Sequence, residues 1–178
     1  MAGCGSDQDP TVASGQSVTT TTTTSGTGPT TTVAPTTTVP RTFSGDLTST
    51  DGYRYRITLE VGDKLTAASA EECAAAPGPG RAAVRVTLTV ANTEANRPAP
   101  SPPVRVELNG PGGRQQVLVR DATGMCTFTP RVPSIGAGQS VVYRGTTPAV
   151  AADAAPGSAG QVEVAVSETR FSLSAPVP

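Results

Sequence analysis

Apolar and polar residues alternate along several short stretches of the chain. In the clearest stretch, residues 82–92, aliphatic side chains occupy every second position and polar side chains lie between them. The aliphatic residues are Val84, Val86, Leu88 and Val90. Because a strand turns successive side chains to opposite faces, this pattern predicts a half-buried strand with one apolar and one wet face. We expect the rest of the domain to pack against this strand.

The same period of two recurs before and after this strand, with turn sequences between the stretches. The alternating segments are 53–61, 104–108, 140–145, 162–166 and 169–174. Residues 115–120 are expected to return from a five-residue loop as a hairpin, and Cys126 and Phe128 lie on a further short strand. Eight short strand candidates without a long helix predict an all-β, immunoglobulin-like antiparallel sandwich of about seven to eight strands.

Two segments allow a different interpretation. Ser69 and Glu72 have the spacing of a capping box, which is compatible with a short helix in the alanine-rich stretch before Pro77. The glycine-rich loop 109–113 has the composition of a phosphate cradle, but such a cradle needs a neighbouring helix and usually a lysine. Strands flank this loop, so we interpret it as a hairpin turn.

The first quarter of the chain differs in composition from the remainder. Residues 11–42 are dominated by threonine and proline and include six consecutive threonines at Thr19–Thr24. They offer too little apolar surface to offset the ~1–2 kcal/mol per residue lost in ordering a backbone. We therefore expect a disordered stalk over residues 1–42 and one folded domain over residues 43–178.

Composition excludes several kinds of chemistry. The chain has no histidine, so a Ser-His-Asp or Cys-His catalytic site within it is impossible, and a zinc site lacks ligands. The formal net charge of −1 gives no reason to expect nucleic-acid binding. Paired carboxylates such as Glu71 and Glu72 leave a hydrolase as a remote alternative. We expect a protein that is not an enzyme and has no catalytic residue, metal or cofactor.

The first four residues resemble the end of a bacterial lipobox. Ala2, Gly3 and Cys4 match the small-residue pair and the lipidated cysteine of that signal, whereas Met1 occupies a position where leucine is usual. The polar residues that follow are typical of a lipoprotein. The resemblance implies that translation starts upstream of Met1, that Cys4 carries a lipid, and that the protein is anchored to the membrane outside the cytoplasm.

Three cysteines allow three pairings or none. If Cys4 carries a lipid, Cys73 and Cys126 remain as an even pair in an oxidising compartment, where a disulfide is expected. It would connect the segment before the organising strand with a strand of the second sheet. Two buried free thiols are the alternative.

From about residue 50 to 173, the chain resembles the immunoglobulin-like lipoprotein domains of uncharacterised function found in secreted proteins of Gram-positive bacteria. The resemblance rests on residues 84–90 running into Asn92-Thr93, on Arg97-Pro98, and on Gly138-Gln139-Ser140 before Val141 and Tyr143. Ala137 stands where that family usually has proline, and no tryptophan fills the core. The family offers no functional residue to transfer.

These observations lead to two functional hypotheses. The first is a lipid-anchored extracytoplasmic module that presents a β-sandwich on a flexible stalk to an envelope protein or a glycan. The second is a structural or envelope-associated accessory subunit without a small ligand. Both place the protein in the cell envelope and require no cofactor.

Overall fold

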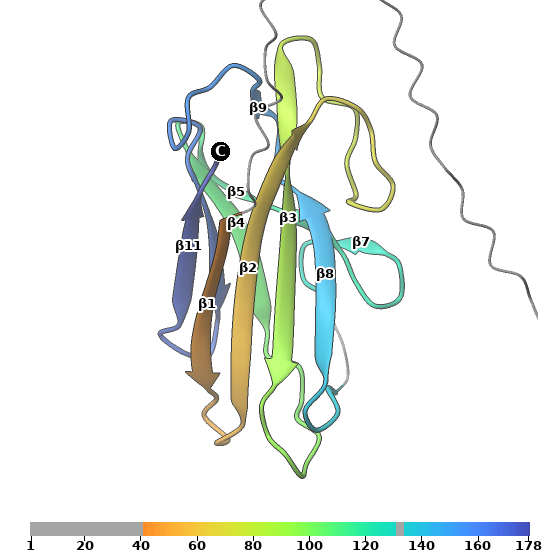
Figure 1. Cartoon of the computed structure of the whole chain (residues 1–178), viewed down its shortest axis with the longest axis vertical. Helices are drawn as coiled ribbons and strands as arrows, with labels where there is room; N and C mark the ends of the chain where they lie inside the picture. Colours follow the sequence, from red (N-terminus) through yellow and green to blue (C-terminus); the bar gives the residue numbers. More distant parts are fainter. Residues whose placement is uncertain (1–40, 131–133) are drawn as a thin grey trace, which may run out of the picture. The chain divides into compact units, whose positions relative to one another are not determined.

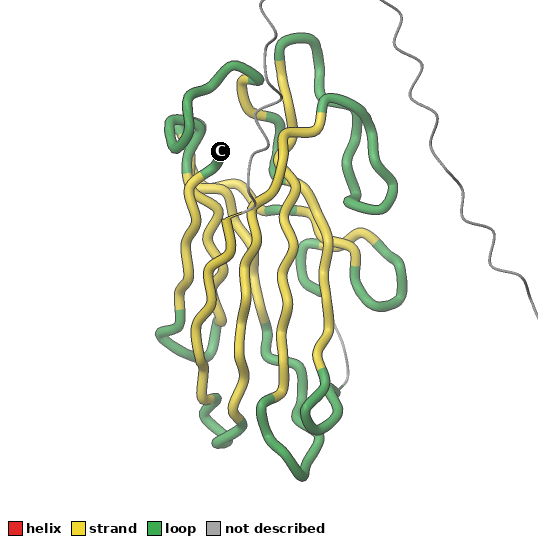
Figure 2. Tube along the Cα trace, in the orientation of Figure 1, coloured by secondary structure: helices red, strands yellow, loops and turns green. Residues whose placement is uncertain are grey.

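The computed structural model describes residues 41–130 and 134–178, and this part of the chain is folded entirely from strands and loops. Two antiparallel sheets pack face to face, as Figures 1 and 2 show. Alternating short strands make one apolar face per sheet, and each sheet buries its apolar face against the other. The antiparallel β-sandwich predicted from the sequence is therefore confirmed.

The described residues form eleven strands instead of about eight. Residues 41–48 and 150–151 form strands that the sequence analysis did not predict, and the expected segment 115–120 is divided between two strands. The strands are β1 (Arg41–Thr48), β2 (Arg54–Leu65), β3 (Arg81–Asn92), β4 (Val104–Gly110), β5 (Gly113–Gln116), β6 (Leu118–Arg120), β7 (Cys126–Thr127), β8 (Ser140–Thr146), β9 (Val150–Ala151), β10 (Gln161–Val166) and β11 (Ser172–Pro176). The larger sheet has the order β1-β2-β3-β8-β6-β7, with β9 also paired to β3. The smaller sheet has the order β11-β10-β4-β5.

Strand β3 occupies the centre of the larger sheet, and it has the one buried and one exposed face that its alternating sequence predicted. It pairs with β2 on one side and with β8 on the other. Val84, Val86, Leu88 and Val90 are fully buried, whereas Arg85, Thr87 and Thr89 are only partly covered. The outer face of this sheet is therefore the solvent-exposed one.

The core between the sheets is aliphatic, with two buried tyrosines. Its largest fully buried side chains are Tyr55, Tyr143, Ile57, Leu59, Leu88, Ile135, Val61, Val84, Val86, Val90, Val104 and Val117. Both tyrosine hydroxyls reach the connection between β3 and β4: Tyr55 donates to the Pro100 carbonyl at 2.6 Å, and Tyr143 lies 3.4 Å from the Ser101 hydroxyl. Each ring thus fills the core while its polar end keeps a hydrogen-bond partner.

Asn92 organises the loops at the end of β3. Its buried side-chain amide donates to the carbonyl oxygens of Arg97, Ile135 and Gly136 at 2.9–3.1 Å. Its side-chain oxygen accepts a bond from the Glu94 amide at 2.9 Å. One side chain therefore ties the β3–β4 connection to the segment that precedes β8.

The expected hairpin over residues 104–120 is only partly correct. Strand β4 does turn back into β5, but Pro111 and Gly112 alone form the turn, and Gly113 takes the left-handed conformation at φ 84°. At Val117 the chain leaves the smaller sheet, and its continuation β6 pairs with β8 in the larger one. The buried Val117 side chain explains the crossing, because it fills the core between the sheets.

The segment before β3 forms a turn instead of a short helix. Ser69 and Ala74 pair in an isolated antiparallel bridge, and the Cys73 amide donates to the Ala70 carbonyl at 3.4 Å. Cys73 has φ 57°, which a helix does not allow. The Ser69 hydroxyl contacts the Glu72 carboxylate, so the spacing of a capping box here closes a tight turn.

Candidate functional site

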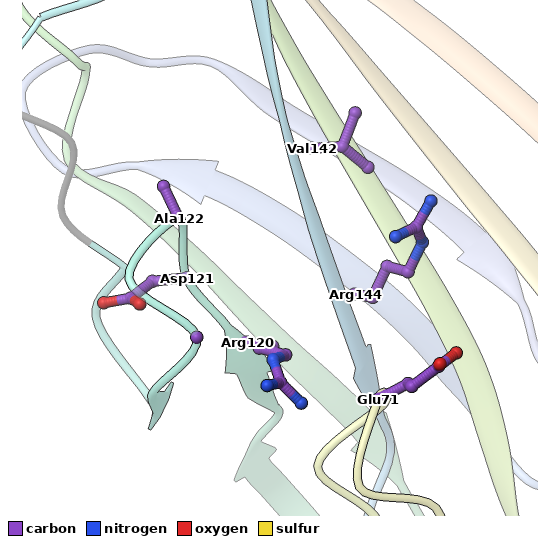
Figure 3. Close-up of a pocket in the computed structure, with 7 residues that line it drawn as sticks. Glu71, Arg120, Asp121, Ala122, Val142 and Arg144 are labelled. Carbon is purple, nitrogen blue, oxygen red and sulfur yellow. The ribbon is translucent and has the colours of Figure 1, made fainter.

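A polar groove lies on the outer face of the larger sheet, where β6 and β8 pass beside the turn 69–74 (Figure 3). Its volume is about 420 Å³. It is lined by Glu71, Arg120, Asp121, Ala122, Gly124, Val142 and Arg144. The pairing of β6 with β8 and the attachment of the turn to the sheet determine its form.

The expected disulfide attaches that turn to the edge of the sheet. Cys73 and Cys126 are bonded, with their Cα atoms 5.7 Å apart. The expected pairing is confirmed, but its expected location is wrong. Cys126 lies on β7, which belongs to the same sheet as β3, because the crossing at Val117 brings β6 and β7 into that sheet.

Polar contacts hold the same turn over the sheet. The buried Glu72 carboxylate accepts a bond from Arg85 of β3 at 2.9 Å, forming an ion pair. Arg120 donates to the Ala70 carbonyl at 2.8 Å, and the Thr146 hydroxyl lies 3.4 Å from the Glu72 carbonyl. With the disulfide, these contacts fix the wall that carries Glu71.

The base of the groove contains two arginines from neighbouring strands. In the register of β6 and β8, Arg120 lies directly opposite Arg144. Neither guanidinium makes an ion pair within 4 Å with a carboxylate of the described residues, although Arg54, Arg56 and Arg85 on the same face do. Like charges directly opposite one another destabilise a strand pair, so this arrangement lowers the stability of the β6–β8 pairing.

The two carboxylates of the groove are engaged differently. Asp121 points to the opposite side from the Arg120 guanidinium (Figure 3) and accepts bonds from the Thr123 amide, the Thr123 hydroxyl and the Met125 amide at 2.6–3.2 Å. These bonds, that from the Thr123 hydroxyl above all, hold the pKa of Asp121 below its ordinary value. Asp121 therefore serves its own turn, and Glu71 is the exposed carboxylate of the groove.

Apolar side chains lie next to the groove. Among the described residues, the large apolar side chains that remain strongly exposed are Met125 (64%), Phe128 (49%) and Val142 (43%). Val142 lines the groove, and Met125 follows directly on its lining residue Gly124. Phe128 lines a second cavity of about 300 Å³, which also contains Cys73 and Leu118. Val142 and Met125 therefore place exposed apolar side chains beside the charged groups of the groove.

The remaining residues singled out in the sequence do not converge on this groove. Cys4 lies outside the described residues. Glu71 and Glu72 do not face the groove together, because Glu72 is buried against Arg85 while Glu71 is exposed. The glycine-rich loop is the tip of the β4–β5 hairpin. Residues 41–130 and 134–178 contain no cluster of three potential metal-ligating side chains.

Sequence reasoning did not find the opposed arginines. The alternation along 140–145 places Arg144 on the outer face, and Arg120 ends an expected strand. Their meeting requires the β6–β8 register, which follows from the crossing at Val117. No local sequence pattern predicts that register.

Comparison with known proteins provides no further assignment: no family model, no curated protein and no solved structure matches the chain. Within the described part of the chain, no helix is suited to crossing a membrane.

Proposed function

We propose that this protein is an extracytoplasmic lipoprotein that presents a β-sandwich interaction module, tethered to the membrane through Cys4. The observation that carries the proposal is the Cys73–Cys126 bond. Disulfides persist in oxidising compartments and are rare in the cytosol, so this bond supports a location outside the cytoplasm. The lipobox-like residues before Cys4 and the threonine-rich segment after it supply the anchor and the tether of this proposal.

The arrangement of the domain supports binding in preference to catalysis. The groove beside the disulfide is open to solvent and contains two arginines without a carboxylate partner among the described residues. Of the strongly exposed large apolar residues, Val142 lines this groove and Met125 follows directly on its lining residue Gly124. Exposed charge next to exposed apolar surface is the composition of a recognition site for another molecule.

Metabolic labelling with a clickable palmitate analogue tests the anchor. The gene is expressed from its own locus with its upstream DNA, as wild type, as Cys4→Ser and as the control Cys73→Ser. We expect label on the wild type and on the control, and none on Cys4→Ser. We also expect Cys4→Ser to leave the membrane fraction. Unlabelled wild-type protein in the cytosolic fraction would contradict the proposal.

Crosslinking on intact cells then separates the interaction module from the accessory subunit. A photoreactive residue at Val142 should capture a partner, whereas one at the exposed Ser44, on the same outer face but three strands away on β1, should not. Equal capture at both positions would favour an accessory subunit that is embedded in an assembly over a wide surface.

A further inference from the structure

We propose that the groove binds an extended acidic segment of a protein partner, with a carboxylate between Arg120 and Arg144 and an apolar side chain beside Val142. The inference rests on the proposed function in that it specifies the partner of the module. It is argued from the paired arginines, from their position in the strand register and from the adjacent exposed apolar residues.

The arginines supply the charge recognition. A guanidinium binds a carboxylate through two parallel hydrogen bonds, and such charge-assisted bonds are stronger than neutral ones. Arg120 and Arg144 are held opposite one another by β6–β8 pairing, and Arg120 is steadied further by the Ala70 carbonyl. A carboxylate placed between them removes their mutual repulsion, so binding and relief of that repulsion act together.

Neither of the two carboxylates that line the groove forms an ion pair with Arg120 or Arg144. Asp121 is occupied by the amides and the hydroxyl of its own turn. Glu71 is exposed and makes no ion pair within 4 Å with an arginine of the described residues. Its negative charge weakens the attraction of an anion to the groove, so the site is tuned to a modest affinity.

The surroundings favour a protein segment over a polyphosphate-like polymer. Polyanion binding relies on a broad positive field, but the chain has a net charge of −1, and Glu71 offsets part of the charge of the two arginines. A polymer of phosphates also has no use for the exposed apolar surface of Val142 and Met125. A peptide supplies both the anion and an apolar side chain.

The strand geometry specifies the spacing within that peptide. Arg144 and Val142 lie on the same face of β8, two residues apart, which corresponds to about 7 Å. Side chains two residues apart in an extended peptide have the same separation. The partner segment therefore carries an acidic residue and a large apolar residue separated by one residue, in either order.

Binding to the purified full chain, carrying Cys4→Ser to prevent thiol crosslinking, tests the inference without depending on location. The probe is the peptide acetyl-Glu-Thr-Leu-amide, followed by NMR at the arginine Nε–H resonances. Matched probes are acetyl-Gln-Thr-Leu-amide, acetyl-Glu-Thr-Ser-amide and inorganic tripolyphosphate. We expect saturable shifts of Arg120 and Arg144 with the first peptide, and clearly weaker binding of the two altered peptides.

Variants of the protein complete the test. Arg144→Gln should weaken binding of the first peptide by about tenfold or more, because it removes a charge-assisted bidentate contact. Glu71→Gln should strengthen it. Arg56→Gln, which removes an arginine of the same face that is already paired with Asp46, should leave it unchanged.

Three outcomes overturn the proposal: absence of saturable shifts, equal binding by Arg144→Gln and the wild type, and tripolyphosphate binding as tight as that of the first peptide. The last outcome would identify a phosphate-bearing ligand instead of a protein. Because the chain tested carries no lipid, each of these results leaves the proposed anchoring at Cys4 untouched.

Discussion

Arg144 of β8 lies directly opposite Arg120 of β6, on the outer face of the larger sheet. Elsewhere on that face, Arg56 is paired with Asp46 and Arg85 with Glu72. The chain thus neutralises arginines of neighbouring strands but leaves this directly opposed pair without a carboxylate among the described residues. A local arrangement that works against folding is expected mainly where function requires it.

Arg144→Gln should therefore raise the stability of the unliganded protein. Removing one of two directly opposed like charges should increase the free energy of unfolding by about 0.2–1 kcal/mol at low salt. The gain should shrink as salt screens the repulsion. Urea unfolding at two ionic strengths measures both effects. Arg56→Gln, which breaks an ion pair, serves as the control and should not stabilise the protein.

The two faces of β3 should respond differently to truncation. Leu88 is fully buried, so Leu88→Ala should cost about 2–5 kcal/mol of unfolding free energy through lost burial and a residual cavity. Thr87 lies on the outer face and is only partly covered, so Thr87→Ala should cost under ~1 kcal/mol. Chemical denaturation of both variants checks the contrast. Equal losses of unfolding free energy in the two variants would mean that the outer face of β3 is buried as well.

The disulfide should contribute substantially to stability. Its cysteines are 53 residues apart in sequence, and closing a loop of this length lowers the entropy of the unfolded chain by an amount worth about 4 kcal/mol. The double variant Cys73→Ala, Cys126→Ala should therefore unfold at a markedly lower temperature in calorimetry. Peptide mapping without reductant should find the two cysteines joined in the wild type. An unchanged melting temperature would show that the bond has no structural role.

Asn92 should be among the most sensitive polar positions. Asn92→Ala removes the donor to three carbonyl oxygens, which should cost about 2–4 kcal/mol because buried acceptors lose their partner. Asn109 is only partly buried and donates to the Glu163 carboxylate, so Asn109→Ala should cost about 1 kcal/mol or less. Thermal unfolding compares the two variants, and a larger loss at Asn109 would contradict the role assigned to Asn92.

Asp121 should make the free energy of unfolding depend on pH in the acidic range. Its pKa in the folded protein lies below the ordinary value of 3.8, chiefly through the bond from the Thr123 hydroxyl. A lowered folded pKa stabilises the protein above the unfolded pKa, and the contribution is lost as pH falls through the folded value. Asp121→Asn should therefore narrow the stability difference between neutral and acidic pH, as measured by thermal melts across that range. An unchanged pH profile would exclude Asp121 as a contributor.

The longer alternating strands and their buried faces could be predicted from the amino-acid sequence alone, whereas β1 and β9 were not. Alternation identified the buried residues of β2, β3, β4 and β10, because the period of two is a property of the backbone. The sequence also supported the disulfide, because the number of cysteines and the lipobox-like start left Cys73 and Cys126 as the remaining pair. The absence of histidine excluded two classes of active site, because both depend on that side chain as the base.

The choice of neighbouring strands, in contrast, depends on tertiary packing. The chain leaves one sheet at Val117 and enters the other, because a single buried valine there fills the core while the backbone on either side pairs with different partners. That crossing puts Cys126 in the sheet of β3 and brings Arg120 opposite Arg144. Strand order and register arise from packing between residues far apart in the sequence, so no local pattern could have predicted the groove.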